Sequence, residues 1–257
     1  MVLLLLTLPP IPQPLWCGSC WAHAATAVMG ARWRIHMSQA NGSSDFSVQQ
    51  LVNCVNNSAT NYNKSGACHG GSAFKAYAYA HEHGVVSSSC LAYSAKQQQC
   101  TALGICDQNL AAPSGKDQRR AVAPKLYKAS EFGFTAGGPW GKTNGSGELP
   151  MMKEISARGP VSICMTTRLT PTKKDVAFDN YKGGIIASSN PRLACDHIVA
   201  VIGYGQTAAK VKYWIVQNSF GAIWGEEGFF RIKRHSSLKT GEYNLGVDSG
   251  QAAWMMP

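Results

Sequence analysis

The sequence predicts an α+β protein in which helices come first and strands come second. Apolar residues recur at helical spacing through the first half of the chain, whereas β-branched and aromatic runs bounded by glycine or polar turns occupy the second half. This order favours a helical lobe and a sheet lobe with a cleft between them, which is a common place for a binding site.

The first half contains three helical patterns and the second half opens with a fourth. Apolar spacing predicts a helix from Ser19 to about residue 35, and Ser47-Val-Gln-Gln50 is a capping-box pattern that opens a short helix. A third helix is expected over 72–83, stopped by Gly84. The fourth is expected to start at Pro150 and to end before Gly159-Pro160.

Four runs in the second half are predicted to be strands. They are rich in β-branched and aromatic residues and lie at 161–165, 197–202, 213–216 and 229–232. Residues 107–149 are rich in Gly, Ser, Pro and Lys, so we expect them to be loops.

Composition narrows the class of protein. The 257 residues are 45% hydrophobic and 15% charged, which argues against a disordered chain. The formal net charge is +10, but the basic residues are scattered and form no stripe, so nucleic acid is not expected as a partner. An anionic partner or an acidic compartment is mildly favoured. No apolar run approaches the roughly 18–20 residues needed to span a bilayer.

The first twelve residues differ in character from the rest of the chain. An apolar octet is followed by Pro9, Pro10 and Pro12, which resembles the hydrophobic part of a secretory signal but has neither a basic start nor a small-residue cleavage site. We therefore expect 1–12 to be a signal remnant or a misjoined segment ahead of one domain over 13–257.

Cysteines and glycosylation patterns favour the secretory route. Nine cysteines fit disulfide bonding better than a reduced cytosol, and their odd number leaves at least one thiol unpaired. Four Asn-x-Ser patterns begin at Asn41, Asn56, Asn63 and Asn144. We expect a lysosomal or secreted protein. A zinc site is not expected, because no second close Cys or Cys/His pair completes the Cys-x-x-Cys spacing of 17 and 20.

Cys17-Gly-Ser-Cys-Trp21 is the run most informative about chemistry. Cys20 lies at the predicted start of an Ala-rich helix, where unpaired backbone N–H groups and the helix dipole stabilise a thiolate. A thiolate is the nucleophile that covalent acyl transfer needs. Taken alone, this run fits a pair of structural cysteines equally well.

Two later segments favour the catalytic interpretation. His197 opens one apolar strand and Asn218 ends the next, so adjacent antiparallel strands can place the two side by side. A protonated His197 would hold Cys20 as a thiolate, and Asn218 would orient the ring.

These motifs resemble the papain family of cysteine proteases, whose signature includes Cys-Gly-Ser-Cys-Trp. The resemblance extends from about Ile11 to about Val247 and is greatest to the cathepsin X (cathepsin Z) branch. The runs that carry it are Ile11-Pro-Gln13, Trp21-Ala-His-Ala24, Tyr79-Ala-His-Glu-His-Gly84, Tyr93-Ser-Ala-Lys-Gln-Gln-Gln-Cys100 and Tyr213-Trp-Ile-Val216.

The resemblance implies a papain-like fold, with a helical lobe over about 17–115, a sheet-rich lobe over about 116–250 and the active-site cleft between them. It implies that Cys20 attacks the scissile carbonyl, that His197 transfers protons and that Asn218 orients the imidazole. It assigns substrate-backbone binding to Gly70 and Gly71. Trp224 and Phe220 match aromatic residues beside the site.

The resemblance also implies disulfides between Cys17 and Cys68, between Cys54 and Cys100, and between Cys90 and Cys106. Cys164 and Cys195 are left over. Their pairing stays open, because it requires their strands to be neighbours.

Departures from the family lie mostly near the start of the chain. The places that the glutamine of the oxyanion hole takes in the family hold Pro14 and Pro9 here, which leaves Gln13 as the nearest substitute. Pro10 stands where the cathepsin X branch has a histidine that anchors the substrate carboxylate. Phe220 replaces a tryptophan that shields the His–Asn hydrogen bond.

Three functional hypotheses remain. The first is a cathepsin X-like carboxypeptidase, the second a catalytically impaired binding protein or an incomplete gene model of an active enzyme, and the third an endopeptidase without carboxylate anchoring. For the enzyme, the expected partners are peptide or protein substrates and cystatin-like inhibitors, and the expected state is a monomer. No metal or organic cofactor is expected.

Overall fold

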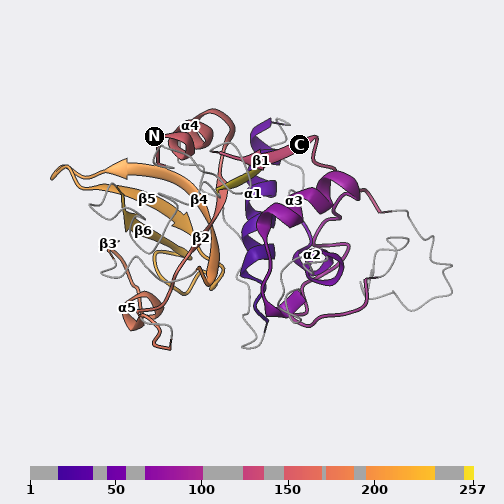
Figure 1. Cartoon of the computed structure of the whole chain (residues 1–257), viewed down its shortest axis with the longest axis horizontal. Helices are drawn as coiled ribbons and strands as arrows, with labels where there is room; N and C mark the ends of the chain where they lie inside the picture. The colour runs from indigo at the N-terminus through magenta and orange to yellow at the C-terminus, as the bar shows by residue number, and fades with distance from the viewer. Residues whose placement is uncertain are drawn as a thin grey trace, which may run out of the picture.

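The computed structural model describes residues 17–36, 45–55, 67–100, 124–135, 148–169, 172–187, 195–234 and 252–257. These residues form an α+β fold, with three helices on one side of the molecule and most of a sheet on the other (Figure 1). The helical elements are α1 (Cys20–His36), α2 (Val48–Cys54), the 3₁₀ turn η1 (Ala67–His69), α3 (Ala73–Glu82), α4 (Glu148–Arg158) and α5 (Val176–Asp179). The strands are β1 (Glu131–Phe134), β2 (Val161–Met165), β3 (Ile185–Ile186), β4 (His197–Gln206), β5 (Lys212–Gln217), β6 (Phe229–Lys233) and β7 (Ala253–Met256).

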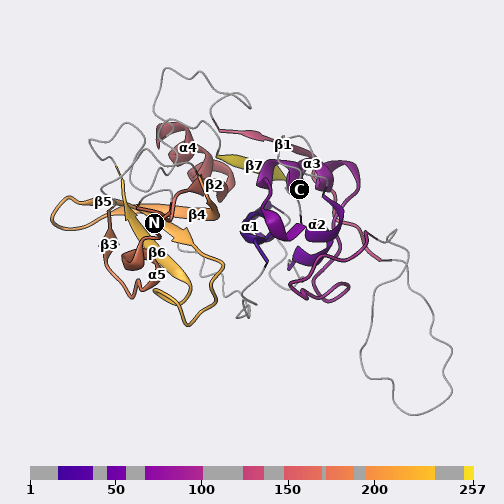
Figure 2. The same cartoon turned by 60° about the horizontal axis from the view of Figure 1, so that its bottom comes forward.

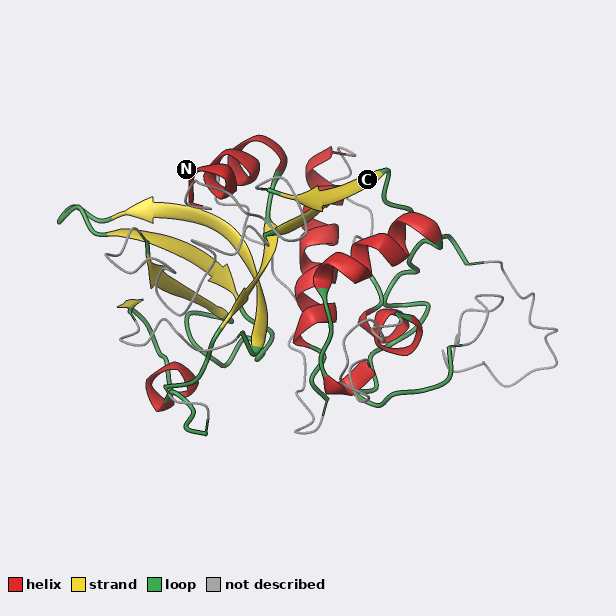
Figure 3. Ribbon diagram, in the orientation of Figure 1, coloured by secondary structure: helices red, strands yellow, loops and turns green. Residues whose placement is uncertain are grey.

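The strands form a seven-stranded sheet in the order β1-β7-β2-β4-β5-β6-β3. Figure 3 shows the strands in yellow and the helices in red. Neighbouring strands are antiparallel except β3 and β6, which are parallel. The centre of the sheet consists of the antiparallel strands β2, β4, β5 and β6. His197 is the first residue of β4 and lies opposite Met165 of β2. One edge of the sheet, formed by β1 and β7, packs against α1 and α3.

Helix α1 lies between the sheet and the other two helices of the helical side (Figure 2). It is rich in alanine, the strongest helix former, and it is buried on most sides, including Trp21, Val28 and Met29. Because α1 contacts both sides of the molecule, the residue at its start is placed at their junction.

Two hydrophobic clusters hold the fold together. The first joins α1, α2 and α3 through residues such as Trp21, Leu51 and Tyr77. The second lies on the sheet and includes Ile163 and Phe230. A hydrogen bond between the hydroxyl groups of Tyr77 in α3 and Ser162 in β2 connects the two sides.

The four predicted helices and the four predicted strands are confirmed, with shifted boundaries. Helix α4 begins at Glu148 rather than at Pro150, because proline is tolerated within a first helical turn. The Ser47 hydroxyl caps α2 by accepting from Gln50 N at 3.0 Å. The amide of Gln50 does not complete the box and instead accepts from Val86 N at 2.7 Å.

The expectation of loops throughout 107–149 is wrong for 131–134, which form β1. This strand is short and contains Gly133, which weakens a strand pattern. Its partner β7 lies near the other end of the sequence, and a Cβ at Gly133 would lie 2.9 Å from the Trp254 ring. The strand therefore forms by pairing with a distant segment, and the Trp254 ring leaves no room for a Cβ at Gly133.

Other expectations fall outside the described residues. They concern segment 1–12, the lobe boundary near 115 and the four glycosylation patterns at Asn41, Asn56, Asn63 and Asn144. Within the described part of the chain, no helix is long and apolar enough to cross a membrane.

Candidate active site

Cys20 is the first residue of α1 and is half-buried. It is the free cysteine of the described residues, since the others among them are disulfide-bonded. The start of a helix presents backbone N–H groups without helical acceptors together with the positive end of the helix dipole. The thiol therefore lies where a negative charge is stabilised.

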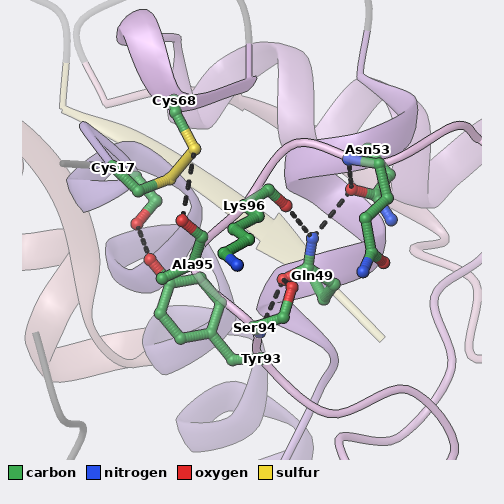
Figure 4. Close-up of a disulfide and its surroundings, with 10 residues drawn as sticks. Cys17, Gln49, Asn53, Cys68, Tyr93, Ser94, Ala95 and Lys96 are labelled. Carbon is green, nitrogen blue, oxygen red and sulfur yellow. Dashed lines mark hydrogen bonds between the residues drawn. A yellow bond between two sulfur atoms is a disulfide. The ribbon is translucent and has the colours of Figure 1, made fainter. Parts of the chain in front are cut away.

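The turn before Cys20 is fixed from two directions (Figure 4). A disulfide joins Cys17 to Cys68, and Gly18 N donates to the Cys68 carbonyl at 2.7 Å. A Cβ at Gly18 would lie 2.9 Å from that carbonyl oxygen, so glycine is required for the close approach. The Ser19 hydroxyl lies 2.5 Å from the hydroxyl of Tyr93. The start of α1 thus has little freedom to move.

His197 and Asn218 are brought together by neighbouring strands. His197 opens β4, and Asn218 follows the last residue of β5. Both side chains are buried, and His197 Nε2 donates to Asn218 Oδ1 at 2.8 Å. Because Nε2 is taken, Nδ1 is the ring nitrogen that is left for the hydrogen bond between His197 and the Cys20 thiol.

The two groups shift each other's pKa in opposite directions. Burial raises the pKa of Cys20, but the hydrogen bond and charge of His197, with backbone hydrogen bonds from Ile198 and Trp21, bring the net pKa below its usual 9.0. Burial lowers the pKa of His197, yet its contacts with Cys20 and Asn218 and the charge of Asp196 bring it above 6.5. This arrangement favours a thiolate beside an imidazolium.

Asp196 is a contributor that the sequence interpretation gave no role. Its carboxylate accepts from Thr167 N at 2.7 Å and from Arg168 Nε at 2.8 Å, and its backbone N–H donates to the Met165 carbonyl at 3.0 Å. These contacts fix the residue directly before His197. Its position next to the histidine in sequence was the available signal, but its partners come from a different strand end.

Aromatic rings surround the buried imidazole. The Phe220 ring lies 5.2 Å from His197, centroid to centroid, and the Phe178 ring lies 6.3 Å away. Trp224 packs on both phenylalanines, and its Nε1 donates to the Asp179 carbonyl at 2.9 Å. Trp224 is only 9% exposed, so it belongs to the core as well as to the surroundings of the site.

Gly70 lies beside the turn that leads to Cys20. Its φ of 104° is a left-handed conformation that favours glycine, and a Cβ there would meet nothing within 4 Å. Gly71 follows it and is half-buried. Open space next to this backbone leaves room for an extended chain. Gln13 lies outside the described residues.

The structure pairs Cys17 with Cys68 and Cys54 with Cys100, as the resemblance implied. Cys90 is disulfide-bonded, and its expected partner Cys106 lies outside the described residues. The sequence left the pairing of Cys164 and Cys195 open. In the structure these two cysteines form a disulfide. No group of three or more His, Cys, Asp or Glu side chains that could hold a metal ion occurs within the described ranges.

Comparisons with known proteins agree with this geometry. The family model described as Papain family cysteine protease matches residues 7–247. Cathepsin Z of Onchocerca volvulus is 30% identical over 95% of this chain and 70% of that protein. A cathepsin L-like proteinase of Fasciola hepatica is 28% identical over 89% of this chain and 58% of its own length. The chain therefore spans only part of these relatives.

Solved structures show the same fold. The bromelain protease from Ananas comosus in complex with the E64 inhibitor has a TM-score of 0.72 and 25% identity, over 97% of this chain and 93% of that chain. A cysteine protease of Carica candamarcensis in complex with E-64 has a TM-score of 0.68 and 26% identity, with the same coverage. The helical side, the sheet and the match over most of the sequence lead to one conclusion: this chain belongs to the papain family of cysteine proteases.

Proposed function

We propose that this protein is a cysteine peptidase in which Cys20 is the nucleophile, His197 the proton-transfer group and Asn218 the residue that orients the imidazole. The observation that carries the proposal is the contact of a free thiol at a helix start with a buried histidine whose other nitrogen is bonded to Asn218. The lowered pKa of Cys20 and the raised pKa of His197 fit a thiolate–imidazolium pair.

The reaction follows from this geometry. The thiolate of Cys20 attacks the scissile carbonyl carbon, and the imidazolium of His197 gives its proton to the leaving amine, so an acyl-enzyme and a free amine form. Neutral His197 then takes a proton from water. The resulting hydroxide displaces the thiolate and releases the carboxylic acid. The backbone N–H at the start of α1 is suited to stabilise the oxyanion in both steps.

A peptide-cleavage assay tests the nucleophile. We expect a fluorogenic peptide to be hydrolysed at acidic pH, and Cys20→Ala to abolish hydrolysis while Ser19→Ala, its neighbour in the same turn, retains it. The E64 inhibitor bound by two structural neighbours should block the native activity. Activity that survives Cys20→Ala would falsify the assignment. A folded native protein that cleaves no peptide would instead favour a binding role.

Within this class we propose a cathepsin X-like carboxypeptidase. Its support is the 30% identity to cathepsin Z of Onchocerca volvulus. The experiment compares a peptide that ends in a free carboxylate with the same peptide as its C-terminal amide. We expect at least about tenfold faster cleavage of the free acid, because an anchored charge lost from the complex costs more than about 1.4 kcal/mol. Equal rates would identify an endopeptidase.

For cellular location we propose the lysosome or secretion. The disulfides of the described residues and four Asn-x-Ser patterns support this location. Enzymatic deglycosylation of protein from its native cells should lower the apparent mass, and the protein should fractionate with secretory or lysosomal markers.

We further propose that the protein is a monomer and that cystatin-like proteins inhibit it. Size-exclusion chromatography tests the oligomeric state, and titration with a cystatin tests the inhibition.

A further inference from the structure

A cavity of about 150 Å³ lies between α1 and the sheet, and Asn218 is one of the residues that line it. Its walls are mainly apolar and come from distant parts of the chain. One face of α1 contributes small residues, and the opposite side is formed by the first residues of β4 and by the region around α2. The residues used in the argument are Ala24, Ala27, Phe46, Val48, Ile198 and Ala200.

The residues that line the cavity differ in exposure. Arg34 and Asp45 have side chains that are 26% and 45% exposed, and they form an ion pair of 3.9 Å. His23 and Asn218 also line the cavity, and they are 5% and 8% exposed. The cavity is therefore lined both by a partly exposed ion pair and by buried polar side chains.

These buried polar groups lack partners. The two ring nitrogens of His23 and the Nδ2 of Asn218 have no hydrogen-bond partner within the described part of the chain. Burying a donor or an acceptor without a partner is unfavourable, so such groups are rarely left without a ligand or a bound water. Both side chains line the cavity. They supply unpaired hydrogen-bonding groups to a cavity whose walls are mainly apolar.

The chemistry of the His23 and Asn218 side chains favours an uncharged ligand. Burial lowers the pKa of His23 to about 4, so its ring is uncharged at higher pH and offers one N–H donor and one nitrogen acceptor. A hydroxyl group can accept from one partner and donate to another. A cavity of about 150 Å³ is known to hold a benzene ring when its walls are apolar. The rings of Tyr93 and Phe46 line the remaining space.

We propose that this cavity is a binding site for a small neutral aromatic molecule that carries one hydroxyl group, with the hydroxyl bonded to His23 and Asn218. Cys20 is not among the described residues that line the cavity. The cavity is therefore not lined by the reacting thiol, although Asn218 does line it. A bound ligand would contact the residue that orients His197.

The experiment uses phenol and toluene, which have nearly the same shape and differ in the hydroxyl group. Binding is measured by calorimetry and by the ¹⁵N resonances of the His23 ring, without any peptide and also in the Cys20→Ala variant. The result therefore does not depend on the proposed peptidase activity. We expect saturable binding of phenol that shifts the His23 resonances. Toluene should bind at least about three- to tenfold more weakly, because one net hydrogen bond is worth about that factor and the phenol hydroxyl forms two.

Variants locate the site. Ala27→Leu places a larger side chain in the cavity and should weaken phenol binding at least about tenfold. Ala157→Leu, on the exposed face of α4, is the matched control and should leave binding unchanged. His23→Phe should abolish the preference for phenol over toluene. Circular dichroism verifies that each variant is folded.

Three results would overturn the proposal. They are the absence of saturable phenol binding to the native protein, equal affinities for phenol and toluene, and unchanged affinity in a folded Ala27→Leu variant. The first result would indicate that only water occupies the cavity. The second would show that His23 and Asn218 take no part in recognition.

Discussion

Arg32 in α1 and Glu154 in α4 form an ion pair of 2.7 Å that is almost wholly buried, with side chains 0% and 9% exposed. The same guanidinium donates to the carbonyls of Gly159 at 2.9 Å and Pro160 at 2.7 Å. One side chain thus satisfies the end of α4 and ties it to the central helix. Its hydrogen bonds offset the cost of burying the charge.

Arg32→Met should therefore destabilise the protein strongly. The substitution removes the hydrogen bonds to the two carbonyls and one partner of buried Glu154, so we expect the free energy of unfolding to fall by about 3–5 kcal/mol. Arg34→Met, in the same helix but half-exposed, should cost less than about 1 kcal/mol. Urea unfolding measures both. Equal losses in the two variants would contradict the assigned role of Arg32.

The buried ring of His23 should make stability depend on pH. Its pKa falls from 6.5 to about 4 on folding because of burial. Between these values the unfolded chain binds a proton that the folded chain does not, so stability is present above pH 6.5 and is lost as the pH falls toward 4. The loss is about 3 kcal/mol. His23→Phe should remove this contribution, which urea unfolding at several pH values would reveal as a flatter dependence.

The Cys20 thiol should react at a lower pH than an ordinary thiol. Since its net pKa lies below 9.0 with His197 as the main favourable contribution, the rate of alkylation by iodoacetamide should rise with a midpoint below pH 9.0. His197→Ala leaves burial less opposed, so the midpoint should move upward. If the two proteins had the same midpoint, the thiolate–imidazolium pair would be disproved.

Asp196→Asn should shift the alkaline limb of the activity profile. The carboxylate raises the pKa of His197, so its loss lowers that pKa and the imidazolium gives up its proton at a lower pH. We expect the limb to move toward acid while the rate at the optimum changes only a few-fold, because an amide oxygen can still accept from Thr167 N. An unmoved limb with a large loss of rate would indicate a purely structural role.

Removing the disulfide between Cys164 and Cys195 should lower stability. The cross-link closes a separation of 31 residues in the unfolded chain, and for loops of this length the loss is about 3–4 kcal/mol. The double variant Cys164→Ser, Cys195→Ser tests this by thermal and urea unfolding. Mass spectrometry of the native protein without reduction should find the linked peptides. Free thiols at both positions would rule out the pairing.

Local sequence signals predicted most of the regular structure. The alanine-rich run after Cys20, the Ser47 cap and the aromatic strand runs each carry their information within a few residues, and each became an element. The juxtaposition of His197 and Asn218 also followed from local signals, because neighbouring strands in sequence are usually neighbours in a sheet.

Long-range relationships could not be predicted in this way. Strand β1 pairs with β7 from near the other end of the sequence, with the Trp254 ring against Gly133. The carboxylate of Asp196 bonds to Thr167 and Arg168, which lie beyond the end of another strand. The cavity beside His23 arises only when α1, α2 and β4 are packed together. The periodicity of apolar residues in the sequence contains no information about these contacts between distant segments, because tertiary packing determines them.

The place of β7 in the sheet has a consequence for biosynthesis. This strand lies between β1 and β2, although it leaves the ribosome long after both. A domain generally folds as one unit, so β1 and β2 cannot complete their pairing until β7 has been made. The sheet beside α1 is therefore completed only after its last strand has been made.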